Sequence, residues 1–240
     1  MGLFDKKFCD FCGGKIGLLG NRKLSDGNMC KDCASGITPH LVGRKTYSVS
    51  DMKEHLEQRA ENKQRLDGFE ATRTLGIGTK IHIDDTNGLL LITSSRKYKD
   101  ENPDVLDFSQ VTGCVLDITE NKREQKKDGP DGKKESYNPP RYDFLYDFYI
   151  TVNFNHKWFD QIKFKVNSST IEGRTAIEYR DTERQAKEIQ QIMQNLHTQI
   201  RENATESAKP KMSVNCPACG ASTIPDKSGC CEYCGSAIGA

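Results

Sequence analysis

Apolar and polar residues alternate along much of the middle of the chain. The alternation is longest from Tyr146 to Phe154, where five apolar side chains occupy every second position, and this period predicts a strand with one buried face. The same period recurs in three shorter segments, around Ile81–Ile83, from Val111 to Ile118 and from Trp158 to Val166. Asn87-Gly88 predicts a hairpin turn into a strand at Leu89–Thr93. We also expect a short strand near Thr175–Tyr179.

Two segments show features of helices instead. Ser48 to Leu66 reads as a polar helix, with Ser48 or Ser50 as its N-cap, and Ser48-x-x-Asp51 resembles a capping box. Its apolar positions form only a thin stripe of Met52, Leu56 and Ala60, so we expect a helical connector that lies against a neighbouring domain, with a partner-binding helix as the alternative. A second, amphipathic helix is predicted to begin near Asp181, with its apolar face formed by Ala186, Ile189, Ile192, Leu196 and Ile200.

The order of these elements predicts the fold class. Six or seven antiparallel strands followed by one helix indicate an α+β fold, a small barrel or sandwich with a C-terminal capping helix. Over roughly residues 69–201 this order resembles the pleckstrin-homology-like fold, which implies a binding scaffold rather than a catalyst. The charged segment 120–140, rich in Gly and Pro, is predicted to be a long solvated loop. Residues 203–213 are predicted to be a polar linker.

Cysteines carry the clearest chemistry in the chain. Nine of the ten lie in two clusters near the ends, and each cluster contains Cys-x-x-Cys twice. This spacing is typical of zinc sites, because two residues between ligands allow both sulfurs of one turn to reach the same ion. The tenth, Cys114, shares one side of a predicted strand with Leu116 and Ile118 and reads as a core thiol.

Glycines distinguish the ligands within the C-terminal cluster. Residues 216–220 and 231–235 share the pattern CxxCG, in which the glycine can adopt a positive φ directly after the second ligand. Pairing Cys230 in place of Cys231 would break both the two-residue gap and the glycine position, so Cys230 is predicted to be a bystander. The expected metal ligands are Cys9, Cys12, Cys30, Cys33, Cys216, Cys219, Cys231 and Cys234.

The N-terminal cluster differs from this ribbon-like pattern. Cys9-Asp10-Phe11-Cys12-Gly13 repeats CxxCG, whereas Cys30-Lys31-Asp32-Cys33-Ala34 lacks the glycine and suits the first turn of a helix. With a hairpin between residues 18 and 28, this predicts a treble-clef arrangement. The C-terminal cluster predicts a zinc ribbon.

Three other chemistries use similar cysteine patterns. A redox Cys-x-x-Cys usually occurs as a single pair on a βαβ frame, an iron–sulfur cluster can use the same ligands, and a catalytic zinc leaves one coordination position open. Neither quartet contains a histidine, and His40, just beyond the first, reads as a surface residue. We therefore expect two structural zinc ions, which stabilise segments too small to fold on a core alone.

The N-terminal segment also resembles a family as a whole. It is similar to an uncharacterised four-cysteine domain of bacteria and their viruses, often placed ahead of a pleckstrin-homology-like domain. The shared features are the start just before Cys9, the run Lys15-Ile16-Gly17-Leu18-Leu19, the motif Leu24-x-Asp26-Gly27, and Cys30-x-x-Cys33. This resemblance supports the architecture and the metal ligands, and it implies no activity.

Together these features predict five segments. They are a treble-clef-like zinc module at 1–47, a helical connector at 48–67, a pleckstrin-homology-like domain at 68–201, a linker at 202–213 and a zinc ribbon at 214–240. We expect a non-enzymatic interaction or adaptor protein, because no P-loop, GxSxG or HExxH motif is present. No signal peptide or membrane-spanning apolar run is visible, so a cytoplasmic location is expected.

Charge limits the alternatives. With 35 Lys and Arg against 34 Asp and Glu, no global field attracts nucleic acid or an anionic membrane. The N-terminal module is moderately basic, so nucleic-acid binding through Lys6, Lys7, Arg22 and Lys23 is one alternative. Binding of membrane headgroups by the central domain is another alternative. The basic residues near its first strands, Arg73 and Lys80, are too few for that role.

Overall fold

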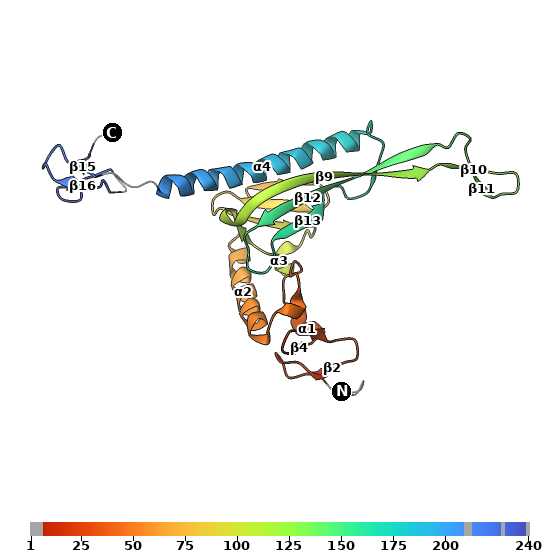
Figure 1. Ribbon diagram of the computed structural model, residues 1–240, viewed down its shortest axis with the longest axis horizontal. Helices are drawn as coiled ribbons and strands as arrows, with labels where there is room; N and C mark the ends of the chain where they lie inside the picture. Colours follow the sequence, from red (N-terminus) through yellow and green to blue (C-terminus); the bar gives the residue numbers. More distant parts are fainter. Residues whose placement is uncertain (1–6, 209–212, 227–228, 239–240) are drawn as a thin grey trace. The chain divides into compact units, whose positions relative to one another are not determined.

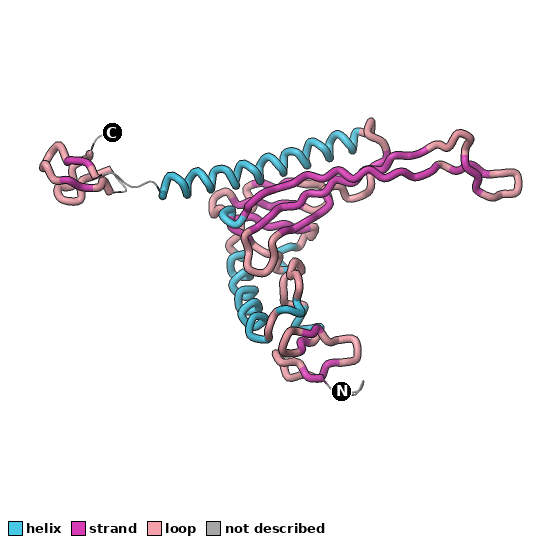
Figure 2. Tube along the Cα trace, in the orientation of Figure 1, coloured by secondary structure: helices cyan, strands magenta, loops and turns pink. Residues whose placement is uncertain are grey.

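The computed structural model describes residues 7–208, 213–226 and 229–238. It divides into two compact units, residues 1–198 and 199–240, and each unit is described by itself. Figures 1 and 2 show the elements of both units. The finer domain boundaries expected inside these units stay a prediction.

The first unit begins with a small module of very short strands. β1 (Lys7–Phe8) pairs with β2 (Lys15–Ile16), and β3 (Arg22–Lys23) pairs with β4 (Asn28–Met29). The short helix α1 (Lys31–Ala34) follows, and a 3₁₀ turn at residues 44–46 leads to α2 (Val49–Asp67). The predicted capping box of α2 is present, since the Ser48 hydroxyl accepts from the backbone N–H of Asp51 and the Asp51 carboxylate accepts from that of Ser48.

Two four-stranded antiparallel sheets follow the module. The first has the order β5 (Arg73–Leu75), β6 (Lys80–Asp84), β7 (Leu89–Thr93) and β8 (Leu106–Asp107), with α3 (Tyr98–Glu101) between its last two strands. The second is built on β12 (Tyr142–Phe154), which pairs with β9 (Val111–Glu124), β13 (Gln161–Lys165) and β14 (Ile171–Glu172). The predicted alternation in β12 is confirmed, because Tyr146, Phe148, Ile150, Val152 and Phe154 are all buried.

One hydrophobic core joins both sheets, the module and α4 (Ile177–Ala208). Figure 1 shows α4 lying along the second sheet. Among its described side chains, the buried ones are Tyr179, Thr182, Ala186, Ile189, Met193 and Leu196. The fully buried residues that the module and α2 contribute to this core are Leu24, Met29 and Met52.

The α+β class and the antiparallel sheets are confirmed, and of the two expected arrangements, a barrel or a sandwich, the closed barrel is absent from the described residues. Strand pairing within the described residues ends at β8, which is two residues long and pairs only with β7. Such a short strand cannot extend the hydrogen-bond ladder to the second sheet. The pleckstrin-homology-like identity of the fold stays a prediction.

The charged segment 120–140 is not the solvated loop that was expected. β9 continues to Glu124, and β10 (Lys126–Asp128) pairs with β11 (Lys134–Ser136) to prolong the β9–β12 ribbon. Cross-strand ion pairs such as Arg123–Asp143 and Lys134–Asp128 bring opposite charges together across the ribbon. Pairing across strands therefore allows a sequence with few apolar residues to remain extended.

Helix α4 corrects three further expectations. It begins at Ile177 rather than near Asp181, so the strand expected near 175–179 is absent. Tyr179, Thr182 and Ala186 are buried at helical spacing, which explains the earlier start. The helix also runs to Ala208, into the expected linker; residues 209–212 of that linker lie outside the described part.

The second unit contains a small strand pair, β15 (Val214–Asn215) with β16 (Ser222–Thr223). An isolated bridge joins Cys230 and Ala237. Cys216, Cys231 and Thr223 are its buried residues among those described.

Candidate metal centres

The sulfurs of Cys9, Cys12, Cys30 and Cys33 lie within 4.8 Å of one another. A tight turn after β1 brings the first pair together, with Cys9 N–H donating to the carbonyl of Gly14 at 2.9 Å and Gly13 N–H donating to that of Cys9 at 2.8 Å. Gly13 has a φ of 68°, a left-handed conformation that a side chain would disfavour. The glycine of the CxxCG pattern therefore has the predicted conformation.

The second pair of this group opens α1, as expected. Cys30 is the N-cap residue, and its sulfur accepts from the N–H of Cys33 at 3.3 Å. The N–H of Cys30 donates in turn to the sulfur of Cys9 at 3.3 Å. These bonds favour thiolate over thiol, because an N–H dipole stabilises negative charge on sulfur.

Four thiols at this separation cannot all ionise without a cation. Burial opposes ionisation of Cys9, but backbone N–H bonds outweigh it and lower the pKa of Cys9 to about 6. Burial and the neighbouring thiols, with the charge on Cys9, raise the pKa of Cys33. A divalent ion at the centre removes this conflict, since it is bound by thiolates and stabilises all of them together.

The C-terminal sulfurs form a second group of the same size. Those of Cys216, Cys219, Cys231 and Cys234 also lie within 4.8 Å of one another. Here both pairs form the same glycine turn, in which Gly220 N–H donates to the carbonyl of Cys216 and Gly235 N–H to that of Cys231, each at 2.8 Å. Gly220 and Gly235 have φ values of 73° and 70°. Hydrogen bonds from the hydroxyl and backbone N–H of Ser236 lower the pKa of Cys234 to about 6.

The sulfur separations match a single tetrahedral ion. A Zn–S bond of about 2.3 Å gives a tetrahedron with S–S edges of about 3.8 Å. The Cys12–Cys30 sulfurs are 3.8 Å apart, the Cys216–Cys234 sulfurs 3.6 Å and the Cys219–Cys231 sulfurs 3.7 Å. A multi-iron cluster would occupy the space between the sulfurs and hold them farther apart. Each group is therefore suited to one ion, and four thiolates are ligands that zinc and a single iron ion both accept.

The structure brings the eight predicted ligands together in two groups and leaves two cysteines outside them. Cys230 is next to a ligand in sequence, but its sulfur is not part of the four-sulfur group. Cys114 is buried in the core, as expected, and burial raises its pKa to about 12.

The motif Leu24-x-Asp26-Gly27 joins the first metal group to α2. Leu24 is buried, and the Asp26 carboxylate accepts from the backbone N–H of Val49 at 2.7 Å. The carboxylate of Asp10, between the first two cysteines, accepts from the N–H of Asn28 at 2.6 Å. A Cβ on Gly27 would lie 2.4 Å from Val49 Cγ2 and 2.7 Å from Asp10 Oδ2, so any other residue would require these side chains to move.

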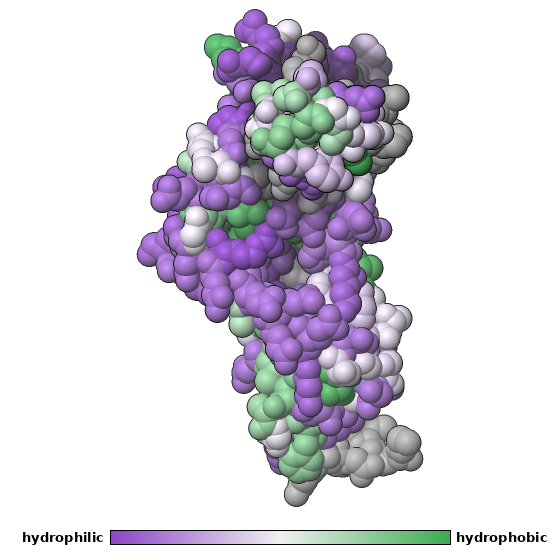
Figure 3. All heavy atoms as spheres, turned by 90° about the vertical axis from the view of Figure 1, so that its left-hand side faces the viewer, coloured by the Kyte–Doolittle hydropathy of each residue, from purple (hydrophilic) through white to green (hydrophobic). Residues whose placement is uncertain are grey.

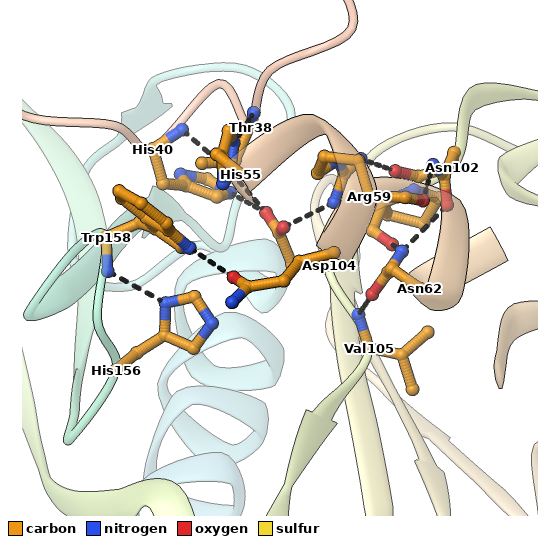
Figure 4. Close-up of polar contacts among 12 residues, drawn as sticks. Thr38, His40, His55, Arg59, Asn62, Asn102, Asp104, Val105, His156 and Trp158 are labelled. Carbon is orange, nitrogen blue, oxygen red and sulfur yellow. Dashed lines mark hydrogen bonds and ion pairs between the residues drawn. The ribbon is translucent and has the colours of Figure 1, made fainter. Parts of the chain in front are cut away.

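Beyond the metal group, a buried polar network connects the module, α2 and the segment before β8 (Figure 4). Asp104 is at its centre, with Arg59 donating to one carboxylate oxygen and the Thr38 hydroxyl to the other, both at 2.5 Å. Asn62 donates to the carbonyl of Pro103 at 2.8 Å and accepts from the N–H of Val105 at 2.8 Å. The module is thus held to the β-sheet region by polar as well as apolar contacts.

Sequence reasoning missed this network because it considered only apolar positions on α2. The buried face of α2 is Met52, His55, Arg59, Asn62 and Leu66, whereas Ala60 of the expected stripe is exposed. The buried positions of α2 recur every three or four residues, as on an amphipathic helix, but polar residues occupy three of them. His40 is also half-buried rather than on the surface, and its Nε2 lies 4.0 Å from a carboxylate oxygen of Asp104.

His55 is held in its neutral form. Its Nε2 accepts from the N–H of Thr38 at 3.0 Å, so Nδ1 carries the proton. Burial, with the nearby charge of Arg59, lowers the pKa of His55 to about 4. The ring packs edge-on against Trp158, with ring centroids 4.7 Å apart. A cavity of about 240 Å³ borders His55, Arg59 and Trp158.

One comparison with known proteins finds a similarity, and it covers only the first part of the chain. Residues 7–55 match a family described as a domain of unknown function, DUF4428. The match covers the first metal group, the Asp26–Gly27 motif and the first residues of α2. No curated protein and no solved structure matches the chain. Within the described residues, no helix combines the length and the apolar character that crossing a membrane requires.

Proposed function

We propose that this chain is a non-enzymatic interaction protein with one structural zinc ion in each four-cysteine group. The observation that carries the metal assignment is the gathering of eight cysteine sulfurs into two groups, each within 4.8 Å. Four thiolates complete a tetrahedral shell and leave no open position for a substrate or a reactive water. This closed shell supports a structural role for the ions.

The small size of the metal modules supports the same role. Each of the six strands in the two modules is two residues long. Strands of this length cannot form stable sheets on their own. In such a module the energy of metal binding contributes directly to folding.

The interaction role rests on the arrangement of these modules along the chain. Each compact unit contains one of them, and the β-sheets between them in sequence contain no metal group among the described residues. Small metal modules joined to a β scaffold are suited to presenting surfaces to partners. A cytoplasmic location, where cysteines stay reduced and available to zinc, is part of the proposal.

Nucleic-acid binding is a second candidate, favoured by one observation. Lys7, Arg22 and Lys23 form no ion pair in the described part of the chain, so their charges are available. Lys6, the fourth residue of this prediction, lies outside the described residues. A cationic surface of this kind binds phosphates with strong dependence on salt.

A capture experiment with the full, metal-loaded chain tests the interaction role. The chain and its Cys12→Ser variant are used as baits in a lysate of the source cells, with and without nuclease, and Cys230→Ser is the matched control. We expect protein partners that survive nuclease, that Cys230→Ser retains and that Cys12→Ser loses. Partners that disappear with nuclease would favour nucleic-acid binding. Equal capture by all three baits would contradict a role for the metal module.

A further inference from the structure

The turn between β2 and β3 exposes two leucines almost completely. Leu18 and Leu19 are 91% and 90% exposed, at the corners of a turn closed by Gly20 N–H donating to the Gly17 carbonyl at 3.0 Å. The Arg22 guanidinium donates to the carbonyl of Leu19 at 3.3 Å and supports the turn. The leucines therefore project from an ordered turn.

Folding does not account for this pair. Turn corners usually carry Gly, Asn, Asp, Ser or Pro, and side chains that are nine-tenths exposed add little to the core. Phe8 on β1 is a further apolar residue of this module, 56% exposed. Figure 3 shows hydrophobic residues on the surface of the N-terminal module, at the lower end of the view, whereas much of the remaining visible surface is hydrophilic.

Cationic side chains flank the turn on both sides. Lys15 lies three residues before Leu18, Arg22 lies three residues after Leu19, and Lys23 follows directly. The register of β1 and β2 places Lys7 opposite Ile16, next to the turn. None of these four forms an ion pair in the part of the chain that the structure describes.

The nearby carboxylates of Asp10 and Asp26 form no ion pair with these cations in the part of the chain that the structure describes. Asp10 accepts from the backbone N–H of Asn28, and Asp26 accepts from that of Val49. Both carboxylates therefore serve the internal structure of the module. The two exposed leucines are therefore flanked by four cationic side chains that form no ion pair among the described residues.

We propose that this turn docks on the surface of an anionic lipid bilayer. Leu18 and Leu19 insert at the boundary between headgroups and acyl chains, where the burial of apolar side chains lowers the free energy of the bound state. Lys7, Lys15 and Lys23 remain at headgroup level, since lysine stems lie along apolar surface while their ammonium groups stay hydrated. This inference rests on the interaction role proposed above and names a partner surface for it.

A bilayer fits this turn better than a protein or a nucleic acid. A stable protein interface buries about 800 Å² on each partner, far more than two leucines on one turn can supply. Nucleic acid is bound by cations and by aromatic stacking rather than by aliphatic side chains. The central domain is less suited to headgroups than the module, because Arg73 forms an ion pair with Asp85 at 2.5 Å.

Flotation of the full, metal-loaded chain with lipid vesicles tests the proposal. One set of vesicles is phosphatidylcholine alone, and the other is an equal mixture of phosphatidylcholine and phosphatidylglycerol. The variants are Leu18→Ser/Leu19→Ser, Lys15→Gln/Lys23→Gln, and a control, Val42→Ser/Ile177→Ser, whose side chains are 66% and 71% exposed elsewhere. Metal content and Trp158 fluorescence verify that each variant is folded.

We expect flotation with the anionic vesicles, weaker flotation with the neutral ones, and a further decrease at high salt. The leucine variant should lose about tenfold or more in partitioning, the lysine variant should lose its preference for anionic lipid, and the control should match the wild type. A folded leucine variant that floats with the anionic vesicles as well as the wild type does would overturn the proposal. Wild-type protein that captures nuclease-resistant protein partners but does not float would overturn the docking proposal alone and leave the proposed interaction role intact.

Discussion

Asp104 and Arg59 form a buried ion pair that ties α2 to the segment before β8. Their side chains are 8% and 10% exposed, and the shortest N–O distance is 2.5 Å. The substitution Asp104→Asn removes the negative charge and leaves the Arg59 guanidinium buried beside a neutral amide. It also weakens the bond from the Thr38 hydroxyl, which comes from the N-terminal module.

The expected magnitude follows from this burial. Removing one partner of a buried pair costs about 3–5 kcal/mol, because the remaining charge stays desolvated without compensation. The chain contains a matched control farther along the same helix, the pair Arg65–Asp107 at 3.0 Å. Its side chains are 39% and 47% exposed, and solvent screening limits such pairs to about 0–1 kcal/mol. We therefore expect Asp104→Asn to be the more destabilising variant by about 3 kcal/mol.

Urea unfolding monitored by tryptophan fluorescence measures both variants. Trp158 is the only tryptophan in the chain. It is 2% exposed, and its indole N–H donates to Gln58 of α2 at 2.6 Å, so it reports on this region. Zinc is kept in the buffer, so that metal loss does not enter the comparison. If Asp104→Asn cost less than about 1 kcal/mol, or no more than Asp107→Asn, the buried pair would not hold α2 in place.

Two further predictions concern acidity and close packing. Because the pKa of His55 is lowered from 6.5 to about 4, folding favours its neutral form; stability should fall as pH decreases from about 6.5 towards 4, by at most about 3 kcal/mol. The free energy of unfolding, measured by urea titration at each pH in this range, should fall less steeply for His55→Gln than for the wild type. Subtracting the two pH curves removes any effect of metal loss that is common to both proteins. Gly27→Ala should lower the free energy of unfolding by about 1–3 kcal/mol, since its Cβ would lie 2.4 Å from Val49 Cγ2. Gly17→Ala, with no atom within 4 Å of its Cβ, is the control, and an equal change in melting temperature for both glycine variants would contradict the packing argument.

Local sequence signals were sufficient where partners are close along the chain. The alternation in β12, the Asn87-Gly88 turn between β6 and β7, and the capping box of α2 each depend on neighbouring residues. The ligands of the two cysteine groups could be predicted because the Cys-x-x-Cys spacing, followed by glycine in three of the four pairs, specifies a local turn. These features required no knowledge of distant contacts.

The features that escaped prediction depend on contacts between distant segments. Arg59 and Asn62 are buried because their partners come from residues 102–105. No sequence feature near α2 indicates those partners. The β10–β11 ribbon resembled a loop because its strands are exposed on both faces. Helix α4 continues past the expected domain end on polar residues, which a pattern of apolar positions does not detect.

Counting the metal ions bound to the intact chain tests the central claim most directly. The chain, purified without chelator, is examined by native mass spectrometry together with Cys12→Ser, Cys219→Ser and Cys230→Ser. The account predicts two zinc ions in the wild type and in Cys230→Ser, and one in each of the other variants at a chelator concentration that leaves the wild type loaded. Wild-type chain that carries no metal while all its thiols are reduced would contradict it.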